Sequence, residues 1–175
     1  ARGLLTRFMR LSHGSGRVTR VIQRRFAHMG RRHLGALEVE MVPENWSGEV
    51  TIKTAVDGQV YNAQVKRYQQ LDNHHLKPVS QGAEEEMTWV RMETNQSGIR
   101  VSEAARTSVS VNGSGRRCER VNSKEAGYAA QEISVKLSKG DHLRVEKVAA
   151  IYTSRDMGIS EPLLEARDEA SRAPG

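Results

Sequence analysis

The run of residues from Leu37 to Val65 alternates strand-like segments with turns, and it constrains the fold more than any other part of the chain. Residues 49–56 place Val50, Ile52, Thr54 and Val56 on one face, which is the period of two of a strand with one packed side. The following pair Asp57-Gly58 predicts a two-residue hairpin turn into a strand over 60–65, because both central residues of such a turn take positive φ. The sequence therefore predicts antiparallel β structure.

Similar patterns predict strands along most of the chain. Arg20 and Arg24 share a face with apolar residues, which is typical of an edge strand that discourages foreign pairing. The apolar parity changes near Lys147, which indicates a bulge or burial on both faces. The further expected strands cover residues 4–12, 17–28, 34–42, 76–79, 88–93, 98–111, 131–137 and 143–152.

The pattern changes to a helical period after residue 157. Ser160, Glu161 and Pro162 form a helix-start signal, because a side-chain oxygen can cap the helix and proline lacks an N–H where none is needed. The helix that follows is short and heavily charged. We expect it to be a strut toward further sequence and not an element of the core.

Charge and composition exclude several classes of protein. Residues 1–37 contain nine Arg and no acid, whereas the rest of the chain holds 18 Lys or Arg against 21 Asp or Glu. Only Phe8 and Phe26 accompany the basic run, so a solvated face or a surface for acidic partner domains is favoured over nucleic-acid binding. No apolar run approaches the roughly 18 residues of a membrane span. The single cysteine, Cys118, excludes an internal disulfide and fits a reducing compartment, so we expect a cytoplasmic protein.

Catalytic and metal-binding signals are weak. Cys118 lies beside Arg116, Arg117 and Arg120, a field that favours a thiolate, but no base is placed for it, so an incidental cysteine is the preferred interpretation. The adjacent residues His74 and His75 lack a third ligand, so we expect no metal and no cofactor.

Two regions are candidates for ligand contact. Residues 66–76 form a polar stretch without a clear period between two strands, and Tyr68, Gln69, His74 and His75 are its candidate site residues, since ordered loops on β scaffolds often carry function. Trp46 is a candidate for stacking on a sugar, although packing against its own hairpin is preferred. We predict no catalytic residue in this chain.

Seven strings, in this order, together resemble glycoside hydrolase family 65. They run across essentially the whole chain and match the amino-terminal domain of that family. They are RHLGAL at 32–37, PENWSG at 43–48, AVDG at 55–58 with Asn62, the stretch from Arg67-Tyr68 to His75-Leu76, ETNQS at 93–97, AART at 104–107 and IYTSRD at 151–156.

The resemblance implies a mainly β protein, an antiparallel β-sandwich of the galactose mutarotase-like type with a short C-terminal helix. It further implies a parent enzyme that cleaves trehalose, maltose or kojibiose with inversion, in which a general-acid Glu protonates the leaving oxygen while inorganic phosphate, or water, attacks the opposite face. Those residues belong to an (α/α)6-barrel beyond residue 175. The implied partners are that barrel and, through a subunit interface, a second copy of the parent.

We therefore expect a sandwich domain over residues 1–157 that lacks its first strands, and the start of a helical linker toward the barrel over residues 158–175. The expected role is a non-catalytic support for the barrel and the oligomer interface. An independent carbohydrate-binding module and a purely structural assembly domain are the alternatives. The first would need exposed aromatic platforms, and the chain offers only Trp46, Trp89 and a few Tyr.

Overall fold

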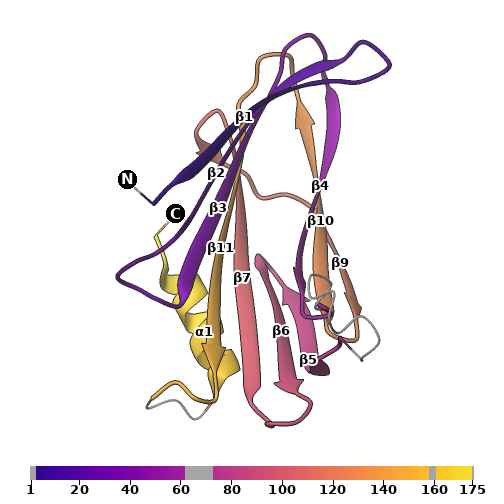
Figure 1. The fold of residues 1–175 in the computed structure, drawn as a ribbon. Helices are drawn as coiled ribbons and strands as arrows, with labels where there is room; N and C mark the ends of the chain where they lie inside the picture. The colour runs from indigo at the N-terminus through magenta and orange to yellow at the C-terminus, as the bar shows by residue number, and fades with distance from the viewer. Residues whose placement is uncertain (1–2, 62–72, 158–160, 175) are drawn as a thin grey trace.

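A computed structural model describes residues 3–61, 73–157 and 161–174, and it contains two facing antiparallel sheets with one helix (Figure 1). The large sheet has the strand order β1-β2-β3-β11-β7-β6-β5, with β8 paired to β7, and the small sheet has the order β4-β10-β9. The strands of the large sheet are β1 (Leu5–Ser12), β2 (Val18–Ala27), β3 (Leu34–Pro43), β5 (Leu76–Glu84), β6 (Met87–Thr94), β7 (Arg100–Val111), β8 (Ser114–Gly115) and β11 (Leu143–Thr153). The small sheet contains β4 (Gly48–Asp57), β9 (Arg120–Glu125) and β10 (Tyr128–Leu137), and the helix is α1 (Pro162–Arg172). The predicted fold class, an antiparallel sandwich with one short C-terminal helix, is confirmed.

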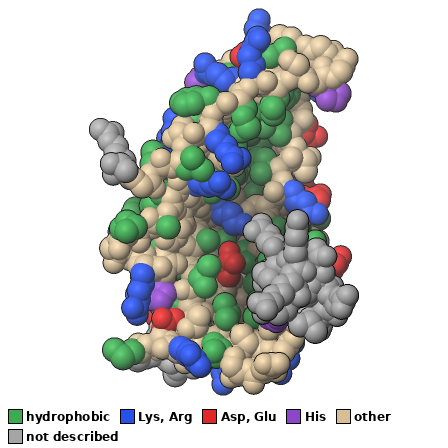
Figure 2. Space-filling view, in the orientation of Figure 1, with side chains coloured by type: hydrophobic (Ala, Val, Ile, Leu, Met, Phe, Trp, Pro, Cys, Tyr) green, Lys and Arg blue, Asp and Glu red, His purple; other side chains and the backbone are tan. Residues whose placement is uncertain are grey.

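The core lies between the two sheets and follows the predicted alternation. Ile133 on β10 has no exposed surface, and it packs with Val109 of β7 and Leu143 of β11 in one cluster. Complete burial of a side chain of this size contributes roughly 1.5–3 kcal/mol. A groove of about 220 Å³ continues this interface between β4 and the strands β3 and β11, and Figure 2 shows hydrophobic side chains gathered along it.

Strand β11 lies at the centre of the large sheet and is covered on both faces. Leu143 packs toward the small sheet, whereas Val148 and Ala150 pack beneath α1. The pairings with β3 and β7 are continuous, without a register shift. Of the two explanations for the parity change near Lys147, burial on both faces is therefore correct.

Helix α1 belongs to the core, so the expectation that it is not a core element is wrong. Ala166 and Ala170 have no exposed surface and pack against Ala104 and Val148. Small side chains on both surfaces let the helix lie close to the sheet. Arg106 of β7 also donates to the carbonyls of Ser171 and Ala173, each at 2.7 Å, and so satisfies acceptors at the helix end.

The N-cap of α1 is Glu161. Its carboxylate accepts a hydrogen bond from the Leu163 N–H at 3.2 Å, and Pro162 follows at the first helical position. Ser160, which the sequence pattern suggested as a source of the cap, lies outside the described residues. Arg91 of β6 lies 3.4 Å from the same Glu161 carboxylate, so the cap residue also ties the helix to the sheet.

Two predictions about turns and edges are wrong. Asp57-Gly58 is no hairpin turn: neither residue has positive φ, Val60 is in no strand, and the Gly58 N–H donates to the Gly127 carbonyl at 2.8 Å. Tyr61 forms only an isolated bridge with His74, and the remainder of the predicted strand, residues 62–65, lies outside the described residues. Strand β2 is internal, and β1 is the edge strand. The chain therefore crosses to the other sheet where a local hairpin was expected.

Strand β9 escaped sequence-based detection, because its segment RVNSKE has no apolar period and is exposed at all but one position. It pairs with β10, whose clean alternation was recognised. Strand β5 extends to Glu84 where the prediction ended it at residue 79, since Ser80 resumes pairing with β6 after a register shift beyond Pro78. Pairing with a neighbour, more than intrinsic propensity, defines both elements.

Candidate functional site

The predicted loop site is only partly described. Tyr68 and Gln69 lie outside the described residues. His74 and His75 are exposed, and the ring of His74 lies 6.0 Å from that of Tyr61. Asn95, in the turn after β6, donates through its side chain to the His74 carbonyl at 2.8 Å and through its backbone N–H to the His75 carbonyl at 3.0 Å. The two histidines therefore lie at the β6–β7 end of the sandwich.

Trp46 lies just before β4 begins, whereas the bridge between Tyr61 and His74 lies beyond the end of β4. A ten-residue strand separates them by roughly 30 Å. The indole is half-buried, donates to the Thr19 hydroxyl at 2.9 Å, and has the Arg17 guanidinium 5.5 Å from its ring centre. The structure thus does not bring Trp46 together with His74 and His75.

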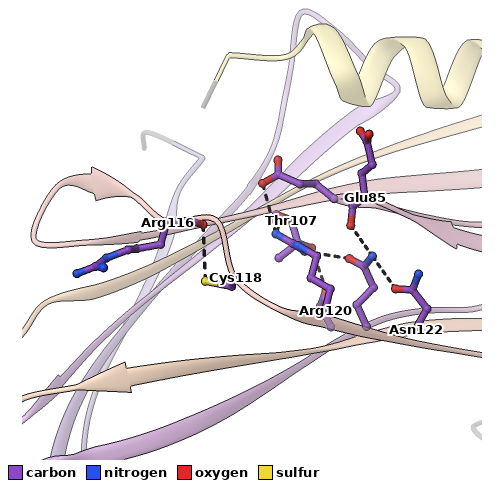
Figure 3. Close-up of polar contacts among 9 residues, drawn as sticks. Glu85, Thr107, Arg116, Cys118, Arg120 and Asn122 are labelled. Carbon is purple, nitrogen blue, oxygen red and sulfur yellow. Dashed lines mark hydrogen bonds and ion pairs between the residues drawn. The ribbon is translucent and has the colours of Figure 1, made fainter.

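A partly buried polar cluster, which we call the polar junction, joins the two sheets where β7, β9 and β10 meet the β5–β6 turn (Figure 3). It consists of Thr54, Thr107, Arg120, Asn122 and Gln131 with the backbone of Glu85 and the carboxylate of Glu86. Arg120 donates to the Gln131 amide oxygen at 3.0 Å and to the Thr107 carbonyl at 2.8 Å, and its guanidinium lies 3.4 Å from the Glu86 carboxylate. This side chain bonds the small sheet to the large one.

Gln131 is the centre of the polar junction and has no exposed surface. Its amide nitrogen donates to the Glu85 carbonyl at 2.7 Å and to the Asn122 side chain at 3.0 Å. Glu85 itself has φ +49°, a left-handed conformation that its pairing with Gln131 helps to hold. Three hydrogen bonds converge on this amide, and one of them bonds the β5–β6 turn to the small sheet.

A hollow of about 630 Å³ opens beside the polar junction and is lined by Arg116, Arg117, Cys118 and Arg120 with the acidic turn residues Glu85 and Glu86. The Cys118 thiol donates to the Arg116 carbonyl at 3.6 Å. Arg120 is already engaged with three partners. The described side chains here form hydrogen bonds that link the two sheets.

Sequence reasoning treated Arg120 only as a neighbour of Cys118 and did not single out Gln131 or Asn122. A signal was present, because Gln131 shares the inward face with Ile133, Val135 and Leu137. A polar residue at a core position of a strand requires partners. Its partners lie 9 to 46 residues away, and no local pattern reveals them.

Two half-buried charged residues, Glu103 and Lys147, lie between the sheets. Glu103 on β7 shares its face with Ala105 and Thr107, which point toward the small sheet, and Lys147 on β11 donates to the Ala55 carbonyl of β4. Burial raises the pKa of Glu103, and the charge of Lys147 opposes this effect. Burial likewise lowers the pKa of Lys147, with Glu103 opposing.

We expect Glu103→Gln to change how stability depends on pH. Because the folded-state pKa of Glu103 is raised, its contribution is fully present below the unfolded value of about 4.3 and is lost as pH rises through the folded value. Relative to the wild type, the variant should therefore gain unfolding free energy as pH rises above the unfolded value of about 4.3, measured by urea unfolding at several pH values. The exposed Glu132→Gln is the control and should show a smaller trend. A pH-independent difference for Glu103→Gln would contradict the assignment.

Among the described residues, no group of three or more His, Cys, Asp or Glu side chains could hold a metal ion. The helix in the described part of the chain is too short and too polar to cross a membrane.

The family model for the N-terminal domain of glycosyl hydrolase family 65 matches residues 1–175. A glycosyl hydrolase of Mycobacterium tuberculosis is 39% identical over 166 residues, which is 95% of this chain and 12% of the relative. Kojibiose phosphorylase of Halothermothrix orenii is 25% identical over 168 residues, covering 95% of this chain and 20% of that enzyme. The α,α-trehalose phosphorylase of Thermoanaerobacter brockii is 25% identical over 176 residues, covering 98% of this chain and 22% of the enzyme.

A solved structure from the human microbiome that bears the name kojibiose phosphorylase superposes with a TM-score of 0.74 at 11% identity, covering 97% of this chain and 20% of that one. At this identity the likeness concerns the fold. The chain spans between about an eighth and about a fifth of the length of the relatives that it matches.

Proposed function

The chain belongs to the N-terminal domain family of glycosyl hydrolase family 65, and on that premise we propose that it is the non-catalytic β-sandwich of an inverting enzyme that cleaves α-glucosidic disaccharides. The observation that carries this proposal is the family match over the full chain, together with phosphorylase relatives about five times as long. The activity of the parent enzyme then depends on residues outside this chain.

The interior of the sandwich supports a scaffold role. Hydrogen bonds of the polar junction hold the β5–β6 turn, and hydrogen bonds from Arg106 hold the end of α1. The turn and the helix end are therefore both fixed to the sandwich. Rigid elements position a partner domain better than mobile ones do. In the parent we assign this sandwich the support of an (α/α)6-barrel and a part in the subunit interface, in a cytoplasmic enzyme.

The proposed parent reaction is phosphorolysis, with inorganic phosphate as co-substrate. Phosphate is already an anion, so the reaction needs a general acid for the leaving oxygen and no separate base. We expect the parent polypeptide to release glucose 1-phosphate from kojibiose, trehalose or maltose, and residues 1–175 alone to release none. Release of glucose without phosphate dependence would make the parent a hydrolase, and turnover by residues 1–175 would contradict the scaffold role.

The loop of residues 66–76 is proposed to reach the mouth of the parent's active site. His75→Ala and Tyr68→Ala in the parent are then expected to raise KM or lower kcat. Ser15→Ala provides the control, because Ser15 is exposed in the turn between β1 and β2, near Asn45 at the other end of β4, and the change should leave both constants unaltered. Steady-state kinetics of the three variants test this proposal. If both loop variants keep the KM and kcat of the wild type, the loop is not part of the active site.

A further inference from the structure

Helix α1 covers only part of the outer face of the large sheet. It packs over β7 and β11 through Ala166 and Ala170, with Leu34 and Val148 beneath it. Beyond β11 the sheet continues through β3 and β2 to the edge strand β1. Apart from Leu34 at the start of β3, the outer face of these three strands has no helix over it within the described residues.

A hollow of about 370 Å³ lies on this uncovered face, directly beside the end of α1. Its apolar floor crosses the sheet in one row, because Phe26 pairs with Ala36 and Ala36 with Val148, and Leu4 lines the outer end. Phe26 is 45% exposed and Leu4 is 48% exposed. A contiguous apolar surface of this kind usually marks a contact with another element.

Charged residues border this apolar row on one side. Arg24 pairs with Glu38, and Arg144 lies 3.0 Å from Glu38 and 3.8 Å from Glu146. The hollow therefore offers an apolar floor with a polar edge that carries both signs of charge. An amphipathic segment, with one apolar face and one polar side, complements such a surface.

The width of the uncovered face matches one helix. Neighbouring strands are about 4.8 Å apart, so β2 lies roughly 10 Å from β11 across the sheet. Packed helices lie about 8–10 Å apart. A single helix beside α1 would thus rest directly on the row that contains Ala36 and Phe26.

The direction of the chain identifies the occupant. Pro174, the last described residue, itself lines the hollow, and Figure 1 places the C-terminal end next to β2 beyond the end of α1. The phosphorylase relatives extend far beyond the matched region in total length. We propose that the segment following residue 175 in the parent polypeptide packs its apolar face on Leu4, Phe26, Ala36 and Val148. This rests on the proposed function, since it requires a longer parent.

Thiol reactivity tests the proposal. In a Cys118→Ser background, Phe26→Cys and the matched exposed position Val121→Cys on β9, 60% exposed in the wild type, are labelled with a maleimide in residues 1–175 and in the parent polypeptide. We expect labelling at position 26 to be at least tenfold slower in the parent than in the shorter chain, and labelling at position 121 to be similar in both. Leu4→Cys repeats the test if Phe26→Cys impairs folding.

Equal labelling at position 26 in the two proteins would overturn the proposal. Protection already present in residues 1–175, accompanied by a dimer in sedimentation at micromolar concentration, would also overturn it and make a second copy the occupant. The disaccharide assay of the parent is independent of labelling. Failure of the docking site and failure of the proposed function can therefore be told apart.

Discussion

Arg120→Met is expected to lower the free energy of unfolding by about 3 kcal/mol. The substitution leaves the buried Gln131 amide oxygen and the Thr107 carbonyl without their donor, and each buried group that loses its partner costs about 1–3 kcal/mol. Only 12% of the Arg120 side chain is exposed, so water cannot readily replace the guanidinium. Urea unfolding of the wild type and the variant measures the difference.

The neighbouring exposed residue provides the control, because Arg117→Met should change stability by no more than about 0.5 kcal/mol. A double variant sharpens the test. Gln131→Leu removes the acceptor, so its combination with Arg120→Met should cost less than the sum of the two single changes. Equal midpoints of urea unfolding for Arg120→Met and Arg117→Met would show that the polar junction does not stabilise the contact between the two sheets.

Ala166→Glu is expected to release α1 from the large sheet. Ala166 has no exposed surface and packs against Ala104 and Ala150, so an unpaired carboxylate there would cost about 3–5 kcal/mol. An isolated helix of 11 residues is marginal in water, so the released segment should also lose its helical structure. Hydrogen exchange of residues 163–172 should become markedly faster, with the rest of the sandwich less affected.

Leu164→Glu is the matched control, since it introduces the same side chain two residues away at a position that is 62% exposed. It should leave exchange in α1 close to the wild-type rate. Similar protection in Ala166→Glu and Leu164→Glu would mean that α1 does not depend on its contact with the sheet.

Strand identity was predictable wherever one face is apolar. The alternation of Ile133, Val135 and Leu137 reports the core directly, and the burial of Val56 at the end of β4 agrees with the predicted face. Strand β9 was not predictable, because its side chains are mostly exposed and its existence depends on pairing with β10. The local sequence pattern indicates which side chains are buried, but it does not indicate which strands pair with each other.

The turn after β4 and the role of α1 show the same limit. Asp57-Gly58 has the composition of a tight turn, yet tertiary pairing with Gly127 decides its conformation. The charges of α1 suggested a helix outside the core, but the small residues Ala166 and Ala170, with Ala173 at the C-cap, are buried against the sheet. Alanine carries little hydrophobic signal in a sequence, although it allows the closest packing against a sheet.

The candidate site was the least predictable part. The polar junction depends on Arg120, Asn122 and Gln131, whose partners come from other strands and from the β5–β6 turn. Trp46 and His75 were both proposed as sugar contacts from their chemistry, as members of two separate regions, and they lie at opposite ends of β4. Whether two residues belong to one site depends on the distance between their segments, and only the fold defines that distance.

The most direct test of the scaffold role is isothermal titration of residues 1–175 with kojibiose, trehalose, maltose and glucose, and with phosphate in a parallel run. We predict no saturable heat with any of these ligands, because the chemistry and most of the sugar contacts are assigned to the remainder of the parent, and a loop that only borders the active site offers too few contacts to bind a sugar by itself. Saturable heat at millimolar or lower concentration, for any of the sugars, would contradict this account and give the sandwich a sugar-binding site of its own.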